Sequence, residues 1–457
     1  MNKNKNLALL TDLYELTMAA SYLEHGMNET AVFSLFVRKY PPHRDYFVSS
    51  GLKEVLEYLN ELKFTDDDLE YLESTGFFKR DFLSYLKNFS FSGDVHAMPE
   101  GTLFFEDEPI IEVTAPLIEA QVIEPFLINT INLQSMIATK ASRCVHAAGS
   151  KELVDFSFRR CQGFDAAMKV AKASYMAGFI GTSNVLAGKQ YGIPIYGTMA
   201  HSFISIFDKE KDAFRAFSQT FPENTILLVD TYDSVSGTIK AAQVGKEMAD
   251  RGKHLKGIRL DSGNMVELSR KARKILDEHE LKKSMIFASG GFDEFKIQKL
   301  LSQKANIDSF GVGTKMGVSA DAPYLDMAYK IAKYNGEPVL KLSTGKMSLT
   351  SDKQVFRYSS KEGLYDHDVI ALRDEKPENG TPLLKPVMSQ GKIIDDSPPL
   401  SEIQTQFKKN FSHLKEKYKS IQNDNKDKPR YPVRISQKLQ KLQEKTVDKY
   451  KKKEIVK

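Results

Sequence analysis

One histidine stands between two hydroxyl side chains in the stretch YGTMAHSF, residues 196–203, directly after the apolar run GIPIYG. The histidine is His201, and the hydroxyls belong to Thr198 and Ser202. Much of an imidazole is unprotonated near neutral pH, so it is a competent nucleophile where an ordinary lysine is not. A histidine held by local hydrogen bonds is the alternative interpretation. The surroundings of His201 in the fold decide between the two.

Charged residues, hydroxyls and glycines follow six apolar runs that we expect to be strands. The runs lie near 152–156, 193–196, 225–229, 256–260, 284–288 and 308–312. They lead to Arg159, Arg160, Thr198, His201, Asp230, Asp233, Arg259, Asp261, Ser262, Gly290, Gly291, Gly311, Gly313 and Thr314. Chemistry in parallel α/β folds sits at the carboxyl ends of strands. Asp, Ser and Gly also cap helices and end strands on their own, but six such ends in succession predict a site.

Two of these strand ends are glycine-rich turns that lead into helices, SGGFDEFK and GVGTKMG. Backbone N–H groups in such turns, together with the helix dipole, bind phosphate. Arg159 and Arg160 add guanidinium groups suited to phosphate or carboxylate. A Walker A loop is absent, because AGKQYG has Gln where that motif has Ser or Thr. The turns therefore predict a phosphate site of another kind. The sequence has no zinc-type spacing of His and Cys, and it leaves the metal ligands unassigned.

The elements that must position these residues divide the chain into three regions. Residues 1–150 mix helical and strand patterns without regular alternation and end in a long helical pattern over 120–148. Residues 151–325 alternate short apolar runs with helical patterns, which implies right-handed βα units and a parallel sheet. At least six such strands favour an irregular or open α/β barrel over a flat sheet. Residues 326–457 begin with antiparallel strand patterns and end in a basic helical tail.

Two helices carry more specific expectations. The helix over 12–25 is predicted to begin with a capping box of Asp12 and Glu15. In the long helix, TKASR carries Lys140 and Arg143, which we expect on a solvated face. Contact with an anionic ligand is the alternative for these two cations.

The composition bounds the class of protein. With 457 residues and 41% hydrophobic content, the chain can bury a large core. Its two cysteines, Cys144 and Cys161, imply no disulfide framework and favour a reducing compartment. No stretch approaches the roughly 20 apolar residues of a membrane span. We therefore expect a cytoplasmic protein without a membrane partner.

The basic tail permits two interpretations. Residues 408–457 hold 17 Lys or Arg and six Asp or Glu, although the whole chain has a net charge of only +5. Such an excess attracts polyanions. The overlapping segment 400–421 carries an apolar helical stripe of Ile403, Phe407, Phe411, Leu414 and Tyr418. We therefore favour a solvated helix face over nucleic-acid binding, and we expect the Lys-rich end past about 435 to be disordered.

Several motifs together resemble one enzyme family along nearly the whole chain. They are LLTDLYELTM (9–18), FRR (158–160), GTSNVLAGKQYGIPIYGTMAHSF (181–203), VDTYDS (229–234), RLDSG (259–263), SGG and GVGT. The family is that of the nicotinate phosphoribosyltransferases. The resemblance implies a type II phosphoribosyltransferase fold, with an N-terminal α/β sandwich, an irregular α/β barrel and a C-terminal extension. It also implies a homodimer with active sites at the interface.

The same resemblance implies an activity: nicotinate and phosphoribosyl pyrophosphate give nicotinate mononucleotide and pyrophosphate, coupled to ATP hydrolysis with Mg²⁺, in NAD salvage. His201 matches the phosphorylated histidine of the family. Phe156 matches the aromatic residue on one face of the pyridine ring, and Tyr14 its counterpart from the neighbouring subunit. The remaining matches are Thr198 and Arg259 for nicotinate, Asp230 and Asp261 near the ribose and Mg²⁺, and Arg159, Gly290, Gly291, Gly311, Gly313 and Thr314 around the phosphates. Arg160 is expected to form a structural ion pair instead.

Two alternatives remain. The nicotinamide enzymes of this fold place an acid after the Gly-Thr pair, where it accepts from the amide, whereas Ser183 stands there in this chain. A carboxylate at that position would repel nicotinate and a serine would not, so the resemblance favours the acid substrate. The other alternative is a catalytically idle protein that binds polyanions through its tail.

Overall fold

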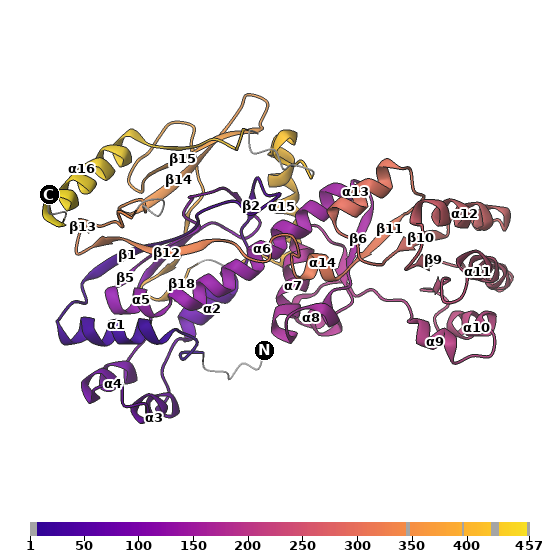
Figure 1. Ribbon diagram of the computed structural model, residues 1–457, viewed down its shortest axis with the longest axis horizontal. Coiled ribbons are helices and arrows are strands. Elements are labelled where there is room, and N and C mark those ends of the chain that lie inside the picture. The colour runs from indigo at the N-terminus through magenta and orange to yellow at the C-terminus, as the bar shows by residue number, and fades with distance from the viewer. Residues whose placement is uncertain (1–6, 344–347, 395–396, 422–428, 455–457) are drawn as a thin grey trace. The chain divides into compact units, whose positions relative to one another are not determined.

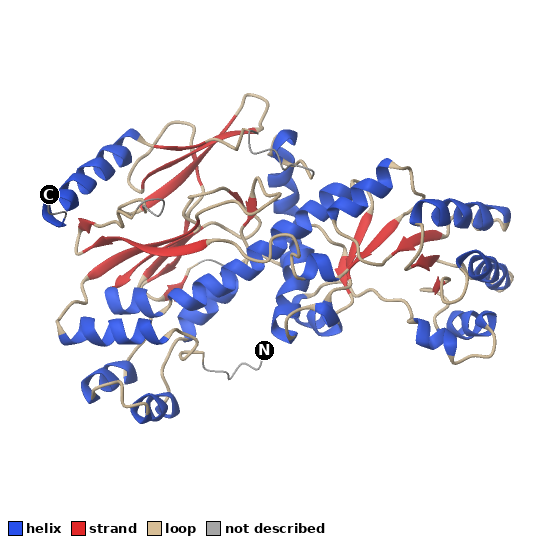
Figure 2. Ribbon diagram, in the orientation of Figure 1, coloured by secondary structure: helices blue, strands red, loops and turns tan. Residues whose placement is uncertain are grey.

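The chain forms two compact units (Figures 1 and 2). This computed structural model describes residues 7–343, 348–394, 397–421 and 429–454. One unit comprises Met1–Met136, Tyr324–Ser420 and Asp424–Lys457, and the other comprises Ile137–Pro323 and Ile421–Asn423. Helix α6, Glu124–Ala148, belongs to both. No helix of the described ranges is long and apolar enough to cross a membrane.

The first unit is built on a seven-stranded antiparallel sheet in the order β13-β12-β1-β5-β3-β17-β18. The strands are β1 (Thr30–Val37), β3 (Asp94–Ala97), β5 (Ile111–Pro116), β12 (Met327–Tyr334), β13 (Glu337–Pro338), β17 (Lys385–Ser389) and β18 (Lys392–Ile393). Strand β12 pairs with β1 in a register that runs from Ala31↔Tyr334 to Val37↔Met327. The strands after the second unit therefore return to the N-terminal sheet.

Two smaller sheets and eight helical segments complete this unit, apart from α6. The strands are β14 (Lys353–Ser359), β15 (Tyr365–Leu372), β16 (Thr381–Pro382) and β19 (Val433–Ile435) in one sheet, and β2 (Phe47–Val48) with β4 (Leu103–Phe104) in the other. The helices are α1 (Leu13–Glu24), α2 (Leu52–Glu61), α3 (Asp66–Ser74), α4 (Arg80–Lys87), α5 (Leu117–Val122), α15 (Leu400–His413), η2 (Glu416–Tyr418) and α16 (Gln437–Glu454).

The second unit is an irregular α/β barrel of six parallel strands in the order β7-β6-β11-β10-β9-β8. Its helices lie outside the strands (Figure 2). The strands are β6 (Glu152–Asp155), β7 (Gly181–Thr182), β8 (Ile226–Leu228), β9 (Gly257–Leu260), β10 (Met285–Ala288) and β11 (Ser309–Val312). The helices are η1 (Phe158–Arg160), α7 (Phe164–Met176), α8 (Val185–Tyr191), α9 (His201–Ser205), α10 (Glu210–Thr220), α11 (Ser234–Ala249), α12 (Met265–Glu278), α13 (Glu294–Ser302) and α14 (Thr314–Gly317). The predicted fold class is confirmed.

One predicted strand is wrong. The run near 193–196 makes only an isolated bridge, between Ile195 and Thr182, and the strand at this edge is β7. Pro194 lacks the N–H that a ladder needs. A Cβ on Gly181 would lie 2.3 Å from Pro194 O, so the two segments approach each other too closely for any other residue at 181.

Two predictions about the helical ends are also wrong. Asp12 precedes α1 but its side chain makes no capping hydrogen bond, because Glu15 N donates to the backbone carbonyl of Asp12 and the Glu15 side chain is buried against Gln121. The Lys-rich end is not disordered over 437–454, where it forms α16. Leu439 is buried, and Gln443 Oε1 accepts a 2.9 Å hydrogen bond from Thr350 N. A buried face of Leu439, Gln443 and Thr446 therefore holds this lysine-rich helix in place.

Candidate active site

Arg259, in β9, connects three segments at the carboxyl ends of the barrel strands. Its Nε donates to Ser289 Oγ at 2.7 Å, beyond β10. Its Nη1 donates to Thr198 Oγ1 at 2.9 Å and to Met199 O at 3.2 Å, and its Nη2 donates to Asp261 Oδ1 at 2.7 Å. The predicted site residues 198, 259 and 261 are therefore in direct contact.

The guanidinium of Arg259 keeps limited capacity for a ligand. Arginine has five N–H donors, and four of them have partners within the described residues. The side chain is 12% exposed, and Cζ lies 5.7 Å from the centre of the Phe156 ring. Burial raises the pKa of Asp261, but hydrogen bonds from Ser289 and Arg259 outweigh it and hold this pKa below its usual value. An ionised Asp261 thus orients an arginine that has one N–H to offer beside an aromatic face.

Asp230, after β8, is not a helix cap. Its Oδ2 accepts from Asp261 N at 2.9 Å and from Ser262 Oγ at 2.6 Å. The caps of the following helices are Asp233 for α11 and Asn264 for α12. Asp230, which follows β8, therefore holds the residues that follow β9. The interpretation of Asp230 and Asp261 as helix caps is wrong.

Asp230 also has the features of a Mg²⁺ ligand. Its Oδ1 is buried and has no hydrogen-bond partner within the described residues. Those residues contain no group of three or more His, Cys, Asp or Glu placed to hold a metal by themselves. Mg²⁺ is commonly held by one or two carboxylates together with substrate phosphates. Asp230, with Asp261 next to it, fits that mode of binding.

His201 is the first residue of α9, and its ring is held from an unexpected direction. Nδ1 lies 3.1 Å from Thr231 Oγ1, in the loop after β8. Thr198 Oγ1 is instead bonded by Arg259, and the Ser202 side chain is exposed. The hydroxyl that contacts the His201 ring is therefore that of Thr231 and not one of the two that flank it in the sequence. The other ring nitrogen, Nε2, has no partner among the described residues.

Phe156 leaves β6 and lies against β11. Its ring centre is 5.5 Å from that of Phe287, with 41° between the planes. A Cβ added to Gly311 would lie 2.7 Å from Phe156 Cδ2. Gly311 was predicted among the phosphate residues, but its missing side chain makes room for the Phe156 ring.

The first glycine turn has the backbone that glycine alone adopts freely. Gly290 and Gly291 have φ angles of +107° and +66°. A Cβ on Gly290 would lie 2.0 Å from Asp261 O, whereas the space at Gly291 is open. Lys296, one turn into α13, donates from Nζ to Gly290 O at 2.7 Å. This turn therefore brings backbone N–H groups and an ammonium close to Asp261.

The remaining predicted residues lie as follows. A Cβ added to Gly313 would lie 3.1 Å from Phe156 O. Thr314 is the first residue of α14, and its side chain is exposed. Arg159 and Arg160 are both exposed in η1, and neither forms an ion pair within the described ranges, so the structural pair expected for Arg160 is not found. Tyr14 belongs to the first unit, in α1, and is 50% exposed.

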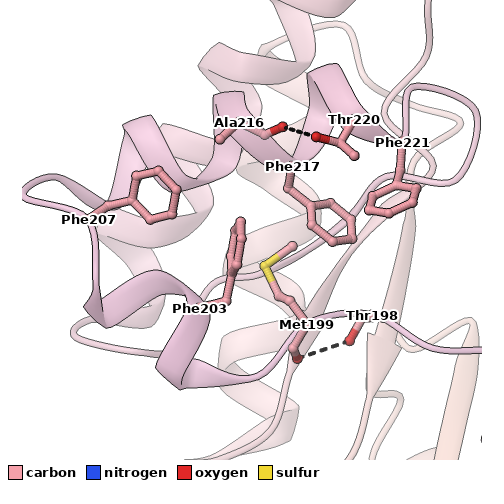
Figure 3. Close-up of a pocket in the computed structure, with 8 residues that line it drawn as sticks. All are labelled: Thr198, Met199, Phe203, Phe207, Ala216, Phe217, Thr220 and Phe221. Carbon is pink, nitrogen blue, oxygen red and sulfur yellow. Dashed lines mark hydrogen bonds between the residues drawn. The ribbon is translucent and has the colours of Figure 1, made fainter.

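A pocket of about 370 Å³ borders the site at Thr198 (Figure 3). It is lined by Thr198, Met199, Phe203, Phe207, Ala216, Phe217, Thr220 and Phe221. Phe203 and Phe217 point toward each other, with ring centres 5.8 Å apart and planes at 73° (Figure 3). Such edge-to-face contact anchors α9, and with it His201, on α10.

Comparisons with known proteins show which family the chain belongs to. Residues 9–132 match the model of the nicotinate phosphoribosyltransferase N-terminal domain, residues 151–366 that of the nicotinate phosphoribosyltransferase family, and residues 376–443 that of its C-terminal domain. The chain belongs to the nicotinate phosphoribosyltransferase family.

Individual relatives in this family cover nearly the whole chain. Nicotinate phosphoribosyltransferase pncB2 of Mycobacterium tuberculosis is 45% identical over 433 residues, which is 94% of this chain and 92% of that protein. Nicotinate phosphoribosyltransferase of Bacillus subtilis is 38% identical over 466 residues, 95% of this chain and 94% of that protein. The crystal structure of human nicotinic acid phosphoribosyltransferase matches with a TM-score of 0.84 and 25% identity, covering 96% of this chain and 100% of that one.

Sequence reasoning missed a buried carboxylate in this chain. Asp155, the last residue of β6, accepts hydrogen bonds from Ser157 N at 2.8 Å and from Thr182 Oγ1 at 2.7 Å. Its backbone carbonyl accepts from Ser183 N at 2.8 Å. Burial raises its pKa, although these hydrogen bonds oppose the shift. Asp155 therefore holds Phe156 and Ser183 in place, and an acid inside an apolar run was its signal in the sequence.

Three further residues of the site were also missed. Ser289 and Thr231 are ordinary hydroxyls next to residues that were singled out, and Lys296 lies five positions after Gly291. Burial and the nearby Lys315 lower the pKa of Lys296. The sequence neighbours of Ser289, Thr231 and Lys296 indicated the correct strand ends. Which partner each of these three side chains contacts depends on the fold.

Proposed function

We propose that this chain is a cytoplasmic nicotinate phosphoribosyltransferase of NAD salvage. It joins nicotinate to phosphoribosyl pyrophosphate and releases nicotinate mononucleotide and pyrophosphate. The observation that carries the proposal is the placement of Arg259 over Phe156 with one N–H unpaired. A planar ring with a carboxylate matches an aromatic face beside a cation.

The chemistry asks the site mainly to hold anions and to align two substrates. The bond from ribose C1 to the pyrophosphate oxygen breaks with its electron pair leaving on pyrophosphate, and the lone pair of the pyridine nitrogen forms the new bond. Charge develops at C1 as an oxocarbenium-like centre, so alignment and fixed charges provide the acceleration. The turn at Gly290 and Gly291, with Lys296 and Arg159, supplies donors for the phosphates.

ATP coupling through His201 belongs to the same proposal. Nδ1 of His201 lies 3.1 Å from Thr231 Oγ1. In the tautomer that this mechanism requires, Nδ1 carries the proton and donates it to Thr231 Oγ1, which leaves the Nε2 lone pair free. Nε2 forms a bond to the γ-phosphorus while the bond to the bridging oxygen breaks and ADP takes the electron pair. Mg²⁺, when bound, neutralises charge on the phosphate groups. Asp230 and Asp261 would hold it.

The proposed assembly is a homodimer in which Tyr14 of the partner subunit covers the open face of the nicotinate ring. Its support is the exposure of an apolar group at the start of the chain, since Leu10, Leu13 and Tyr14 are 55%, 50% and 50% exposed. Apolar side chains gathered in this way mark an interaction surface more often than isolated ones do.

The test is pyrophosphate release measured with nicotinate, nicotinamide and quinolinate side by side. We expect nicotinate to be converted far better than nicotinamide, because Arg259 offers charge to a carboxylate and Ser183 offers none to an amide. Ser183→Asp should narrow the preference and Ser183→Ala should keep it. A wild-type preference for nicotinamide would overturn this account of the pocket. Salt-sensitive polyanion binding without turnover of any of the three compounds would favour the idle binding protein.

A further inference from the structure

Helix α6 carries two cations that do not face solvent. Lys140 and Arg143 are each 1% exposed, so the expected solvated face is wrong. Both bind Glu294, which is fully buried: Lys140 Nζ lies 2.5 Å from Oε2, and Arg143 Nε lies 2.9 Å from Oε1. Asp321, 19% exposed, lies 2.6 Å from Lys140 Nζ. We call Lys140, Arg143, Glu294 and Asp321 the buried ion cluster.

Stability alone does not account for such a cluster. Removing several charges from water costs more than their attraction commonly returns, and apolar side chains of similar volume are often at least as stable. Its ion pairs join two cations of α6 to Glu294 and Asp321 at short, defined distances. The cluster therefore gives definite positions to the segments that carry these side chains.

Glu294 is the first residue of α13, and it follows Asp293, the N-cap of that helix. Asp293 Oδ1 accepts from Lys296 N at 2.8 Å, and Asp293 Oδ2 lies 2.7 Å from Lys315 Nζ. Lys296 Nζ in turn donates to Gly290 O at 2.7 Å. The start of α13 is thus tied to α6 through Glu294 and to the first glycine turn through Lys296.

The second glycine turn is tied to the same point. Lys315 is the second residue of α14, directly after the turn formed by residues 311–314. Asp293 is buried and the Lys315 side chain is exposed, so water reaches this ion pair only from the side of the lysine. All of these residues lie in the second unit. The pair Asp293–Glu294 therefore connects one helix to both turns that the sequence assigns to phosphate.

We propose that Glu294, held by Lys140 and Arg143, is a positioning residue for the two glycine turns and so for the phosphate groups of phosphoribosyl pyrophosphate. The proposal rests on the proposed function for the identity of that substrate. Arg259 takes its position from Thr198, Asp261 and Ser289, and Phe156 packs against Phe287. Loss of the Glu294 charge should consequently weaken anion binding and spare nicotinate binding.

The chain offers a matched control. Arg357 and Asp368 form another buried ion pair, with side chains 4% and 0% exposed, between β14 and β15 of the first unit. Asp368→Asn removes a buried carboxylate from an arginine, as Glu294→Gln does, at a place without a phosphate turn. A purely structural role for the buried ion cluster predicts the same behaviour for both variants.

The experiment measures the Kd of inorganic pyrophosphate by calorimetry on the full-length protein, together with the melting temperature and the KM of each substrate. For Glu294→Gln we expect the pyrophosphate Kd and the phosphoribosyl pyrophosphate KM to rise about tenfold, and the nicotinate KM to change by no more than about twofold. For Asp368→Asn we expect a lowered melting temperature with all three binding constants within about twofold.

Other outcomes overturn the inference. An unchanged pyrophosphate Kd in folded Glu294→Gln, or an equal rise in the nicotinate KM, would do so. If Glu294→Gln does not fold, Lys140→Met, which leaves Arg143 on Glu294, must give the same selective loss in weaker form. A wild type that binds pyrophosphate but does not turn over nicotinate refutes the proposed function, while the pyrophosphate Kd still decides the role of Glu294. A wild type that does not bind pyrophosphate refutes this inference.

Discussion

Replacing Gly311 by alanine tests whether the absence of a side chain there positions the nicotinate ring. The added Cβ would lie 2.7 Å from Phe156 Cδ2, 2.8 Å from Phe156 Cε2 and 3.0 Å from Phe287 Cε1. Carbon atoms pack best at about 3.5–4.0 Å. The Phe156 ring must therefore retreat by about 1 Å, toward the place where we propose that nicotinate stacks.

The size of the effect follows from this clash. Overpacking of a closely packed site costs about 1–3 kcal/mol. If the displaced ring transfers this cost to the substrate, the nicotinate KM rises about 5- to 150-fold. The phosphoribosyl pyrophosphate KM should change much less, because the Cβ direction of Gly311 faces the two aromatic rings and not the turn at Gly290.

Initial rates over a nicotinate titration at saturating phosphoribosyl pyrophosphate measure the effect. Gly197→Ala is the control, since a Cβ at Gly197 meets no atom within 4 Å and its φ is not in the left-handed region. It should leave both KM values near those of the wild type. A folded Gly311→Ala protein with an unchanged nicotinate KM would refute the role given to Phe156. A selective rise in the phosphoribosyl pyrophosphate KM would indicate that Gly311 contributes to phosphate binding.

Three further predictions concern other parts of the molecule. His201→Asn should abolish acid-labile phosphate incorporation from γ-labelled ATP and uncouple ATP hydrolysis from synthesis, with slow ATP-independent synthesis remaining; full labelling of the variant would show that another residue takes the phosphate. Burial raises the pKa of Glu15 to about 7. The native state therefore holds this proton to higher pH than the unfolded chain, and the free energy of unfolding falls as pH rises from about 4.5 to about 7, by about 1–3 kcal/mol. Urea unfolding at pH 5 and pH 8 should show a smaller loss for Glu15→Gln, and an equal loss in both proteins would assign it to other groups. Truncation after residue 435 should lower the melting temperature, because the buried Leu439 and the Gln443 hydrogen bond are lost. Turnover measured below that temperature should stay near that of the full chain, and its collapse in folded protein would give the tail a part in the site.

The strand ends that carry the site could be predicted from the sequence. The carboxyl ends of parallel strands meet at one edge, so polar residues after successive apolar runs must come together whatever their partners are. For this reason Arg259 and Asp261 were expected in one place with Thr198, and the structure joins the three by direct hydrogen bonds. Strand direction brings Arg259 and Asp261 to this edge, whereas the run before Thr198 forms only an isolated bridge.

The partners of those residues could not be predicted in the same way. Thr231, and not one of the neighbouring hydroxyls, bonds the His201 ring. Asp233 and Asn264 cap the helices, which leaves Asp230 and Asp261 for the site. A hydrogen bond depends on distances of a few tenths of an ångström, and residue order within a loop does not specify them.

The clearest contrast between sequence and tertiary structure lies in α6. The sequence by itself predicted one long helix over 120–148, of which the structure forms α6 from residue 124 onward, and it placed Lys140 and Arg143, three positions apart, on one face of that helix. Only the tertiary structure decided that this face is buried, because Glu294, which neutralises both cations, lies 151 residues from Arg143 in the chain. A charged side chain enters an interior only with a partner, and a helical pattern contains no information about a partner that distant. The local conformation of this chain therefore follows from its residue pattern, whereas the burial of its charges follows from long-range packing.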